Sequence, residues 1–518
     1  MACLRRCFRN SVQSAPLLNI RNIRNNQELA GSRFSRRDFV KGALALGALT
    51  LPGCKSNSKT KNAPRIAIIG AGIAGLSAAH ALAKSGVASE IYEAGARAGG
   101  RILTLDNIVA PGTYTEAGGE FIDTDHADMM ALAREFGLEI KDALGGEYSG
   151  LTENAWFFGG RLRSEADVAA AVREFTTEIQ VDMGGFPETI QAGTGGKTAE
   201  LDAMSLEEYL GKRGVTGWLR DLIIAAYVSE FGLDAGKQSC LNLLTLVSLD
   251  TAGGRFAVFG DSDERFRIQG GNQALTDAMA KRYLDSLHPG HRLEAVYPNG
   301  NGFKLAFRTQ NGTLETKADA VILALPFTLL RSVEFHLELP AIKRKAITEL
   351  GYGTNSKLFV GYSSRPWRKA GFAGNFFSEG LLQGGWEHTK IQPGVAGGLT
   401  LFQGGSAGLR MGESGPAAQA AGMADALEGV FPGTKSARNG NVGIFHWPTY
   451  PLSLGSYACY MPGQWTGIAG EERKPVGNLF FAGEHCSRDF QGYMNGGAET
   501  GREAAKALLS KWRDAPKA

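Results

Sequence analysis

The sequence predicts an α/β fold in which a Rossmann-like nucleotide-binding domain is interleaved with a second, α+β domain. Three observations support this prediction. A glycine-rich turn joins an apolar strand to a helix near residue 70. A second glycine-rich segment follows another apolar strand near residue 480. The chain has 518 residues, which is enough for a large core and two domains.

The first glycine-rich turn has the sequence pattern of a strand, a turn and a helix. Ile66 to Ile69 is apolar and is expected to form a buried strand. Gly70, Gly72 and Gly75 follow in the spacing G-x-G-x-x-G. Small and apolar residues then recur at helical spacing from Ile73 to Leu82. Because all three parts occur in this order, the pattern indicates a dinucleotide site rather than an isolated turn.

Each residue of this motif has a physical reason to be there. Gly70 permits the tight turn, Gly72 lets the backbone approach a pyrophosphate, and Gly75 lets the helix pack on the strand. The N-terminus of the helix then faces the negative charge. Glu93 ends a second strand, 18 residues after Gly75, where it can accept hydrogen bonds from ribose hydroxyls.

Two further motifs identify the type of dinucleotide. Gly99-Gly100-Arg101 follows Glu93 closely, and a nicotinamide dehydrogenase needs no such loop there. Phe480 to Ala505 reads FFAGEHCSRDFQGYMNGGAETGREAA. With these motifs the chain resembles the FAD-dependent amine oxidase family of monoamine and polyamine oxidases, over roughly residues 64 to 512. The resemblance implies an FAD-binding Rossmann-like (GR2-type) domain with an interleaved α+β substrate domain.

The resemblance also implies which residues contact FAD. They come from the first motif, from the loop after it, from two middle segments and from the C-terminal motif. For Val296, the role of an ordinary strand valine is an equally good interpretation, and for Trp447 a buried structural tryptophan fits almost as well. The residues are Gly70, Gly72, Ile73, Ala74, Gly75, Glu93, Ala94, Arg97, Gly99, Gly100, Arg101, Gly118, Gly119, Glu120, Val296, Trp447, Gly483, Glu484, Gly492, Tyr493 and Met494. A helix that begins near Gly497 is expected to direct its N-terminal amides at N1 and O2 of the flavin, where negative charge develops.

Four positions are expected to determine the chemistry. Tyr457 and Tyr493 match the two family rings that frame the substrate amine beside the flavin. Lys357 matches the family lysine that reaches N5 of the flavin through a water. Ser456 occupies the position where mammalian monoamine oxidases carry a cysteine bonded to the flavin. Because serine cannot form that thioether, we predict a non-covalent FAD.

Both domains are expected to be discontinuous, with the chain crossing between them several times. We assign residues 64–150, 266–340 and 441–512 to the FAD-binding domain, and 151–265 and 341–440 to the substrate domain. The segment 151–265 reads as mainly helical, with apolar spacing in Leu219 to Val228 and Leu241 to Leu249. Other expected elements are a strand ending at Gly118 to Phe121, a helix from Ala127 to Phe136, strands at Ala318 to Pro326, Leu358 to Tyr362, Thr400 to Gly405 and Asn478 to Gly483, and a last helix from near Gly497 through Ala505.

The first 63 residues read as an export signal and linker. Ser35 to Lys41, SRRDFVK, is a twin-arginine pattern. Gly42 to Leu51 is apolar but too short to span a bilayer. Leu51 to Cys54 resembles a lipoprotein cleavage box, although Pro52 fits it imperfectly. We therefore predict twin-arginine export to the periplasm, with a membrane tether where Cys54 is lipidated; a disordered basic tail is the alternative.

Composition excludes several other classes. A hydrophobic content of 43% and a charged content of 21% are ordinary for a globular protein. The net charge of +3 is small and evenly spread, which argues against a nucleic-acid partner. Three of the six cysteines lie in or beside the N-terminal extension, and no C-x-x-C or His/Cys cluster predicts a metal. The sequence carries no signal for the oligomeric state.

The predicted function is FAD-dependent oxidation of a small-molecule amine. The resemblance implies hydride transfer from the α carbon to flavin N5, hydrolysis of the imine to an aldehyde or ketone, and reoxidation by oxygen or a periplasmic electron acceptor. An L-amino-acid oxidase is the nearest alternative, but the expected carboxylate-binding Arg is absent from Ala117 to His126, AGGEFIDTDH. A desaturase or protoporphyrinogen oxidase has no need for Lys357 or the tyrosine pair. A non-catalytic flavoprotein would not need them either.

Overall fold

The computed structural model describes residues 64–513. These belong to one compact unit, which spans Ala63–Ala518. The predicted twin-arginine pattern and Cys54 lie outside the described residues and stay predictions. Among residues 64–513, no helix combines the length and the apolar character that crossing a membrane requires.

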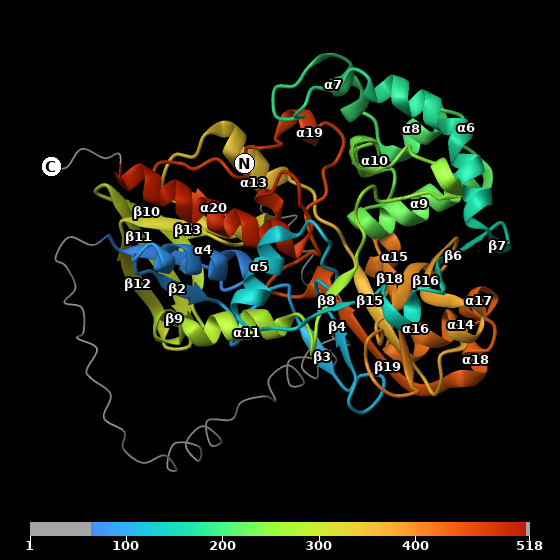
Figure 1. The fold of residues 1–518 in the computed structure, drawn as a ribbon. Helices are drawn as coiled ribbons and strands as arrows, with labels where there is room; N and C mark the ends of the chain where they lie inside the picture. The colour runs from blue at the N-terminus through green and yellow to red at the C-terminus, as the bar shows by residue number, and fades with distance from the viewer. Residues whose placement is uncertain (1–63, 514–518) are drawn as a thin grey trace, which may run out of the picture. The chain divides into compact units, whose positions relative to one another are not determined.

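A five-stranded parallel sheet holds the first nucleotide motif at its centre (Figure 1). Its strand order is β20-β13-β1-β2-β9, and every pair is parallel. The strands are β1 (Ile66–Ile69), β2 (Glu90–Glu93), β9 (Leu287–Pro289), β13 (Ala320–Leu323) and β20 (Leu479–Phe481). Segments from both ends of the chain therefore meet in one sheet, which confirms the predicted α/β fold.

Two helices from opposite ends of the chain pack against each other beside this sheet (Figure 1). They are α4 (Ile73–Lys84) and α20 (Met494–Arg513). Helix α20 begins before the predicted start near Gly497 and runs beyond Ala505. The predicted helix was therefore too short at both ends. In the structure, a Cβ at Gly501 would overlap the carbonyl oxygen of Ala74, so this glycine permits close packing.

A four-stranded sheet adjoins the parallel sheet. Its order is β12-β11-β10-β14. The strands are β10 (Arg292–Asn299), β11 (Gly302–Thr309), β12 (Gly312–Ala318) and β14 (Glu334–Phe335). The Tyr92 ring on β2 stacks on Phe307 of β11, with centroids 4.5 Å apart, so the two sheets share an apolar core.

A seven-stranded mixed sheet forms the other half of the described chain, on the side away from α4 and α20 in Figure 1. Its order is β19-β15-β18-β17-β16-β6-β7. The strands are β6 (Thr152–Phe158), β7 (Arg161–Arg163), β15 (Ser356–Tyr362), β16 (Phe372–Ser378), β17 (Gln383–Glu387), β18 (Gly397–Gln403) and β19 (Arg438–His446). β15 and β18 match the strands expected there, whereas β6 and β7 lie in a segment that was expected to be mainly helical.

Five α-helices come from the same segment, and one of them covers part of this sheet. They are α6 (Glu165–Met183), α7 (Gly196–Asp202), α8 (Leu206–Lys212), α9 (Gly217–Phe231) and α10 (Leu241–Leu246). The two helical predictions are confirmed here, but α10 ends at Leu246 because Val247 adopts an extended backbone. Helix α9 contacts β16, β17, β18 and β6. Its C-terminal end is important for the site described below.

The remaining elements are short and connect these layers. The predicted helix after residue 126 is α5 (Ala127–Glu135), and the strand expected to end at Gly118 to Phe121 ends at Glu116. The other strands are β3 (Thr104–Asp106), β4 (Tyr114–Glu116), β5 (Ile140–Asp142) and β8 (Phe266–Ile268). The other α-helices are α11 (Gln273–Arg282), α12 (Phe327–Leu330), α13 (Ala341–Glu349), α14 (Pro366–Lys369), α15 (Gly405–Arg410), α16 (Pro416–Gly422), α17 (Ala424–Val430), α18 (Thr434–Ala437) and α19 (Gln464–Gly467).

Candidate active site

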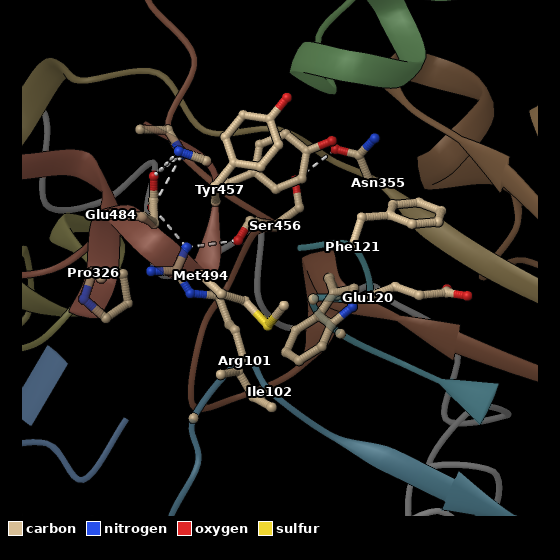
Figure 2. Close-up of a pocket in the computed structure, with 18 of the residues that line it drawn as sticks. Arg101, Ile102, Glu120, Phe121, Pro326, Asn355, Ser456, Tyr457, Glu484 and Met494 are labelled. Carbon is tan, nitrogen blue, oxygen red and sulfur yellow. Dashed lines mark hydrogen bonds and ion pairs between the residues drawn. The ribbon is translucent and has the colours of Figure 1, made fainter. Parts of the chain in front are cut away.

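One cavity, with a volume of about 310 Å³, collects nearly all the predicted site residues (Figure 2). It lies outside the carboxyl ends of β1, β2 and β20, where ligands bind in open α/β sheets. The lining residues include Gly70, Gly72, Ile73, Ala74, Glu93, Ala94, Arg97, Gly99, Gly100, Arg101, Gly118, Gly119, Glu120, Lys357, Trp447, Ser456, Tyr457, Gly483, Glu484, Gly492, Tyr493 and Met494. Gly75 and Val296 do not line it. Val296 is fully buried in the apolar core of β10.

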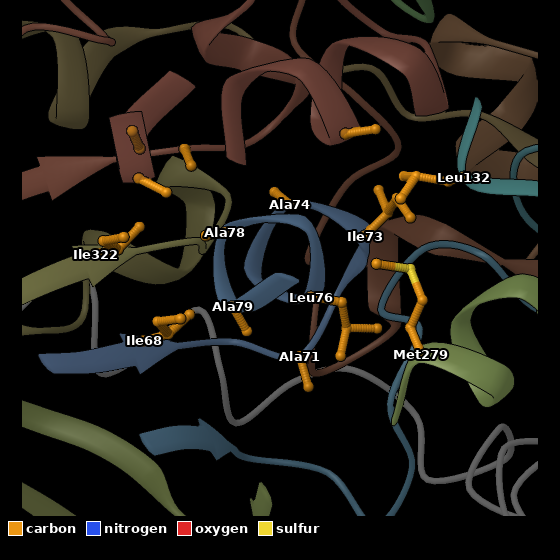
Figure 3. Close-up of a cluster of buried hydrophobic side chains, with 14 of the residues drawn as sticks. Ile68, Ala71, Ile73, Ala74, Leu76, Ala78, Ala79, Leu132, Met279 and Ile322 are labelled. Carbon is orange, nitrogen blue, oxygen red and sulfur yellow. The ribbon is translucent and has the colours of Figure 1, made fainter. Parts of the chain in front are cut away.

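The turn after β1 has the shape that its glycines predict. Gly70 has φ +100°, and a Cβ there would approach the carbonyl oxygen of Ala324 to 2.6 Å. A Cβ on Gly75 would overlap the carbonyl oxygen of Gly70, so Gly75 acts beneath the turn rather than on the cavity. The apolar residues of α4 that hold this turn, among them Leu76 and Ala79, pack into a buried cluster (Figure 3).

The residues on this side of the cavity fit a dinucleotide. Gly72 faces open space: the nearest atom to a Cβ there would be Cα of Gly100, at 3.9 Å. Glu93 is fixed by the backbone, since its Oε2 accepts from the Ala71 amide at 2.8 Å and its Oε1 from the Gly95 amide at 2.6 Å. A carboxylate at the end of β2 and a bare glycine turn are the features that ribose and pyrophosphate require.

Arg97 and Arg101 are both engaged by the protein. Arg97 donates to the carbonyl oxygens of Ala98, Gly100 and Ile102, so it braces the Gly-Gly-Arg loop. The Nη1 atom of Arg101 donates to Glu484 Oε1 and to the Ser456 carbonyl oxygen, each at 2.7 Å (Figure 2). The charge of Arg101 is therefore paired with a glutamate of the chain, and Arg97 is bound to backbone carbonyls.

Glu484 connects three segments of the site. Besides Arg101, it accepts a hydrogen bond from the Gly492 amide at 2.9 Å and one from the Ala458 amide at 3.3 Å. Gly492 precedes Tyr493, and Ala458 follows Tyr457. The buried Glu484 carboxylate thus positions the backbone beside both tyrosines.

Both predicted tyrosines line the cavity and are anchored by the end of helix α9. The Tyr457 hydroxyl donates to the Ser229 carbonyl oxygen at 3.1 Å. The Tyr493 hydroxyl donates to Glu230 Oε1 at 3.2 Å. Burial raises the pKa of both phenols well above the usual value, so both stay neutral.

Lys357 lies at the cavity wall, with its ammonium fully engaged. Its Nζ donates to the carbonyl oxygens of Glu116 (3.0 Å) and Gly118 (2.8 Å) and to Glu120 Oε2 (3.3 Å). Burial lowers the pKa of Lys357, although the neighbouring carboxylates partly oppose this effect. Glu120 also pairs with Arg267 at 3.4 Å. Lys357 is therefore held against the loop that lines the cavity.

Ser456 and Trp447 also have defined contacts. The Ser456 hydroxyl is buried and donates to Asn355 Oδ1 at 2.6 Å (Figure 2). The Trp447 indole donates to the Ala117 carbonyl oxygen at 2.8 Å. Met494 begins helix α20 and packs against Gly119, where a Cβ would approach its Cγ to 2.6 Å.

Two acidic residues of the cavity were missed by the sequence analysis. Glu230 lies in the last turn of α9, and Glu264 lies in the loop before β8. Burial raises the pKa of Glu230 to about 7 and that of Glu264 well above its usual value. In the sequence both resemble ordinary surface glutamates. Only a positive φ of 43° at Glu264, which the sequence does not show, marks it as unusual.

The fold and the cavity define a nucleotide-dependent oxidoreductase with a buried aromatic substrate site. The family model described as flavin-containing amine oxidoreductase matches residues 73–509. The chain therefore belongs to this family, and it is a flavin-dependent amine oxidoreductase that acts on CH–NH2 donors. The family implies FAD as the cofactor.

Known relatives include oxidases of amines and of amino acids. An L-amino-acid oxidase of Daboia russelii is 24% identical over 479 residues, which cover 86% of this chain and 89% of the relative. A flavin-containing amine oxidase of Danio rerio is 25% identical over 471 residues, with 87% and 86% covered. These likenesses indicate flavin-dependent oxidation of an amine or amino acid.

Solved structures share the fold. The cyclohexylamine oxidase of Brevibacterium oxydans superposes with a TM-score of 0.76 at 21% identity, covering 87% of this chain and all of that one. A putrescine oxidase bound to putrescine superposes with a TM-score of 0.73 at 20% identity, covering 86% and 99%.

Proposed function

We propose that the protein oxidises a small-molecule amine with a non-covalently held FAD. The observation that carries this proposal is a single cavity that joins the glycine turn and Glu93 to the buried pair Tyr457 and Tyr493. When bound, FAD supplies the chemistry by accepting hydride from the carbon next to the amine nitrogen.

The residues of the chain then bind and orient the amine. The rings of Tyr457 and Tyr493 offer electron-rich faces to a nitrogen-bearing carbon chain. Aromatic walls also exclude water, and a dry cavity favours the neutral amine, which is the form that can release hydride. We propose that Lys357 orients water beside the flavin, as the resemblance implies, by exchanging its longest hydrogen bond, 3.3 Å to Glu120, for that water.

Non-covalent binding is supported by the residues around Ser456. The hydroxyl of Ser456 is engaged with Asn355 and cannot form a thioether. No cysteine is among the cavity-lining residues in the described part of the chain. Cys459 is buried elsewhere, with its sulfur 3.5 Å from the Asn242 amide nitrogen.

Oxidation of an L-amino acid is the second candidate, because relatives of that name match most of the chain. Such a substrate needs a cation for its carboxylate. Of the three cationic side chains that line the cavity among residues 64–513, Arg101 and Lys357 bind glutamates and Arg97 binds carbonyl oxygens. This charge pattern supports an amine over an amino acid.

Three other expectations remain proposals. We propose the FAD-binding and substrate domains with the boundaries given above; strand β19 begins at Arg438, just before the boundary at 441. We also propose twin-arginine export with a lipidated Cys54, and oxygen or a periplasmic electron carrier as the oxidant.

The proposal is tested by adding amines to the holoenzyme without oxygen and following loss of the yellow flavin absorbance. Tyr457→Ala together with Tyr493→Ala should slow this bleaching strongly while FAD content stays close to that of the wild type. Tyr297→Phe, on strand β10 outside the cavity, is the matched control. Failure of every amine to bleach the flavin would refute the function.

The mode of FAD binding is tested separately. Acid precipitation should leave the yellow colour in the supernatant, because no bond holds FAD to the chain. Colour that stays with the precipitated protein would contradict the assignment of Ser456.

A further inference from the structure

At one end of the cavity the charged side chains have ion-pair partners or backbone hydrogen bonds. At the other end two carboxyl groups have no cationic ion-pair partner among the residues that the structure describes. Arg101 pairs with Glu484, and Lys357 pairs with Glu120. Glu93 is satisfied by two backbone amides, and Arg97 by three carbonyl oxygens. Two carboxylates remain, those of Glu230 and Glu264, and within residues 64–513 no cation forms an ion pair with either.

Glu230 sits at the substrate end of the cavity, next to the tyrosine pair. Its Oε1 accepts from Tyr493 at 3.2 Å, and the preceding Ser229 carbonyl oxygen accepts from Tyr457 at 3.1 Å. Both tyrosine hydroxyls therefore donate hydrogen bonds to consecutive residues in the last turn of α9. The C-terminal turn of a helix presents partial negative charge, which adds to the carboxylate and favours a cation.

Glu264 reaches the same end of the cavity from a different element. It lies in the loop before β8, where the charges of Glu230 and Asp123 raise its pKa further and that of Arg267 partly opposes them. Its backbone has φ 43° and is held by a hydrogen bond from its amide to Asp123 Oδ1 at 3.0 Å. A non-glycine residue in this conformation costs stability, so surrounding contacts must hold the side chain where it is.

A carboxyl group in a partly dry cavity takes up a proton unless a positive charge compensates its ionised form, and burial accordingly raises the pKa of both Glu230 and Glu264. The reacting nitrogen cannot provide that charge, because hydride release requires the neutral amine. A second, cationic group on the same substrate, at a distance from the reacting carbon, would let both carboxyls ionise and pair with it. Both carboxyls line the cavity that also holds the two tyrosines, so a substrate framed there can present such a group to them.

We propose that Glu230 and Glu264 form a binding subsite for a second, remote ammonium group, so that the preferred substrates are diamines or polyamines rather than monoamines. This inference rests on the proposed amine oxidation. Glu230 is the main specificity-determining residue, because its position beside Tyr493 fixes the remote ammonium relative to the reacting carbon. Glu264 adds charge from the facing loop.

The test compares substrates that differ only by a terminal group. Each linear α,ω-diamine is matched with the monoamine in which a methyl group replaces the second amino group, across a series of chain lengths. For wild-type holoenzyme, the kcat/KM of the best diamine should exceed that of its matched monoamine by about 10- to 100-fold, as expected for a charge-assisted hydrogen bond.

Glu230→Gln should lower the kcat/KM of the diamine about tenfold or more beyond any fall for the matched monoamine, so that the ratio drops by that factor. Glutamine keeps an oxygen that can accept from Tyr493, so the tyrosine stays in place. Glu264→Gln should reduce the ratio less. Glu174→Gln, on an exposed position of α6, is the matched control and should leave the ratio unchanged.

The outcomes separate this inference from the proposed function. Oxidation of amines with the same kcat/KM for both members of each pair would overturn the subsite and leave amine oxidation intact. An equal fall for diamine and monoamine in Glu230→Gln would also overturn it, because Glu230 would then act only on Tyr493. Failure to oxidise any amine would refute the proposed function itself. FAD content measured for each variant shows whether it is folded and loaded.

Discussion

Replacing Glu484 with glutamine should disturb both the stability and the active site of this enzyme. The carboxylate has a side-chain exposure of only 7% and binds Arg101, Gly492 and Ala458. All three partners are donors. Glutamine offers one acceptor oxygen and one NH2 group, so in either orientation its NH2 faces at least one of these donors. The buried charge pair with Arg101 is lost as well.

The magnitude follows from these contacts. Loss of a buried hydrogen bond between charged groups costs about 1.5–3 kcal/mol, and an unsatisfied buried amide adds about 1 kcal/mol or more. We therefore expect a loss of about 2–4 kcal/mol from the free energy of unfolding, a large part of the 5–15 kcal/mol typical of proteins. Because Gly492 and Ala458 adjoin the two tyrosines, a shift of about 1 Å there should also lower turnover up to about 100-fold.

The assay is urea unfolding of the holoenzyme followed by circular dichroism, with amine turnover measured on the same samples. Glu503→Gln is the matched control, since its ion pair with Arg473 is long, at 3.7 Å, and its side chain is 41% exposed. The control should change stability by about 0.5 kcal/mol or less. An unfolding midpoint and turnover of Glu484→Gln equal to those of the wild type would show that Glu484 does not position the site.

Three other changes have defined outcomes. Gly75→Ala should abolish FAD binding or folding, because the new Cβ would overlap the Gly70 carbonyl oxygen; a yellow, stable variant would contradict the geometry of the turn. Lys357→Met should keep FAD but slow flavin reoxidation by oxygen in stopped-flow measurements, and unchanged kinetics would remove its assigned role. The preference for diamines over monoamines should increase from about pH 6 to pH 8, because burial raises the pKa of Glu230 to about 7 and the carboxylate attracts a cation only when ionised; a ratio that is flat with pH would speak against ionised Glu230 as the binding group.

The nucleotide half of the fold could be predicted because its signals are local. The positive φ of Gly70 and the contact of Gly75 with the Gly70 carbonyl oxygen lie within five residues, so the glycine spacing alone indicates strand, turn and helix. Two features depended on distant partners instead. Strand β6 pairs with β16, more than 200 residues away, and Gly501 of α20 permits close packing against Ala74 of α4, more than 400 residues away.

The candidate site likewise contains residues that sequence motifs identify and residues that only the packing of distant segments brings there. The residues facing the nucleotide, Lys357 and the tyrosine pair all belong to motifs, and the structure brings all of them except Gly75 and Val296 to one cavity. Glu230 belongs to no motif. Its position depends on how α9 packs against β16 and β17, and its contact with Tyr493 joins residues that are 263 positions apart.

Substrate choice in this fold therefore depends on charge balance that only the packed structure reveals. The motifs explain how a flavin is held and how a neutral amine is framed, and these needs are common to monoamines, polyamines and amino acids. These substrates differ in the charge on the part of the molecule remote from the reacting carbon. Monoamines carry no charge there, polyamines carry a positive charge and amino acids carry a negative one. In this cavity the lining cations are all engaged, whereas two carboxylates lack cationic partners among the described residues. The substrate that removes this imbalance is the one with a second positive charge, and this is why Glu230 rather than any motif residue is expected to decide specificity.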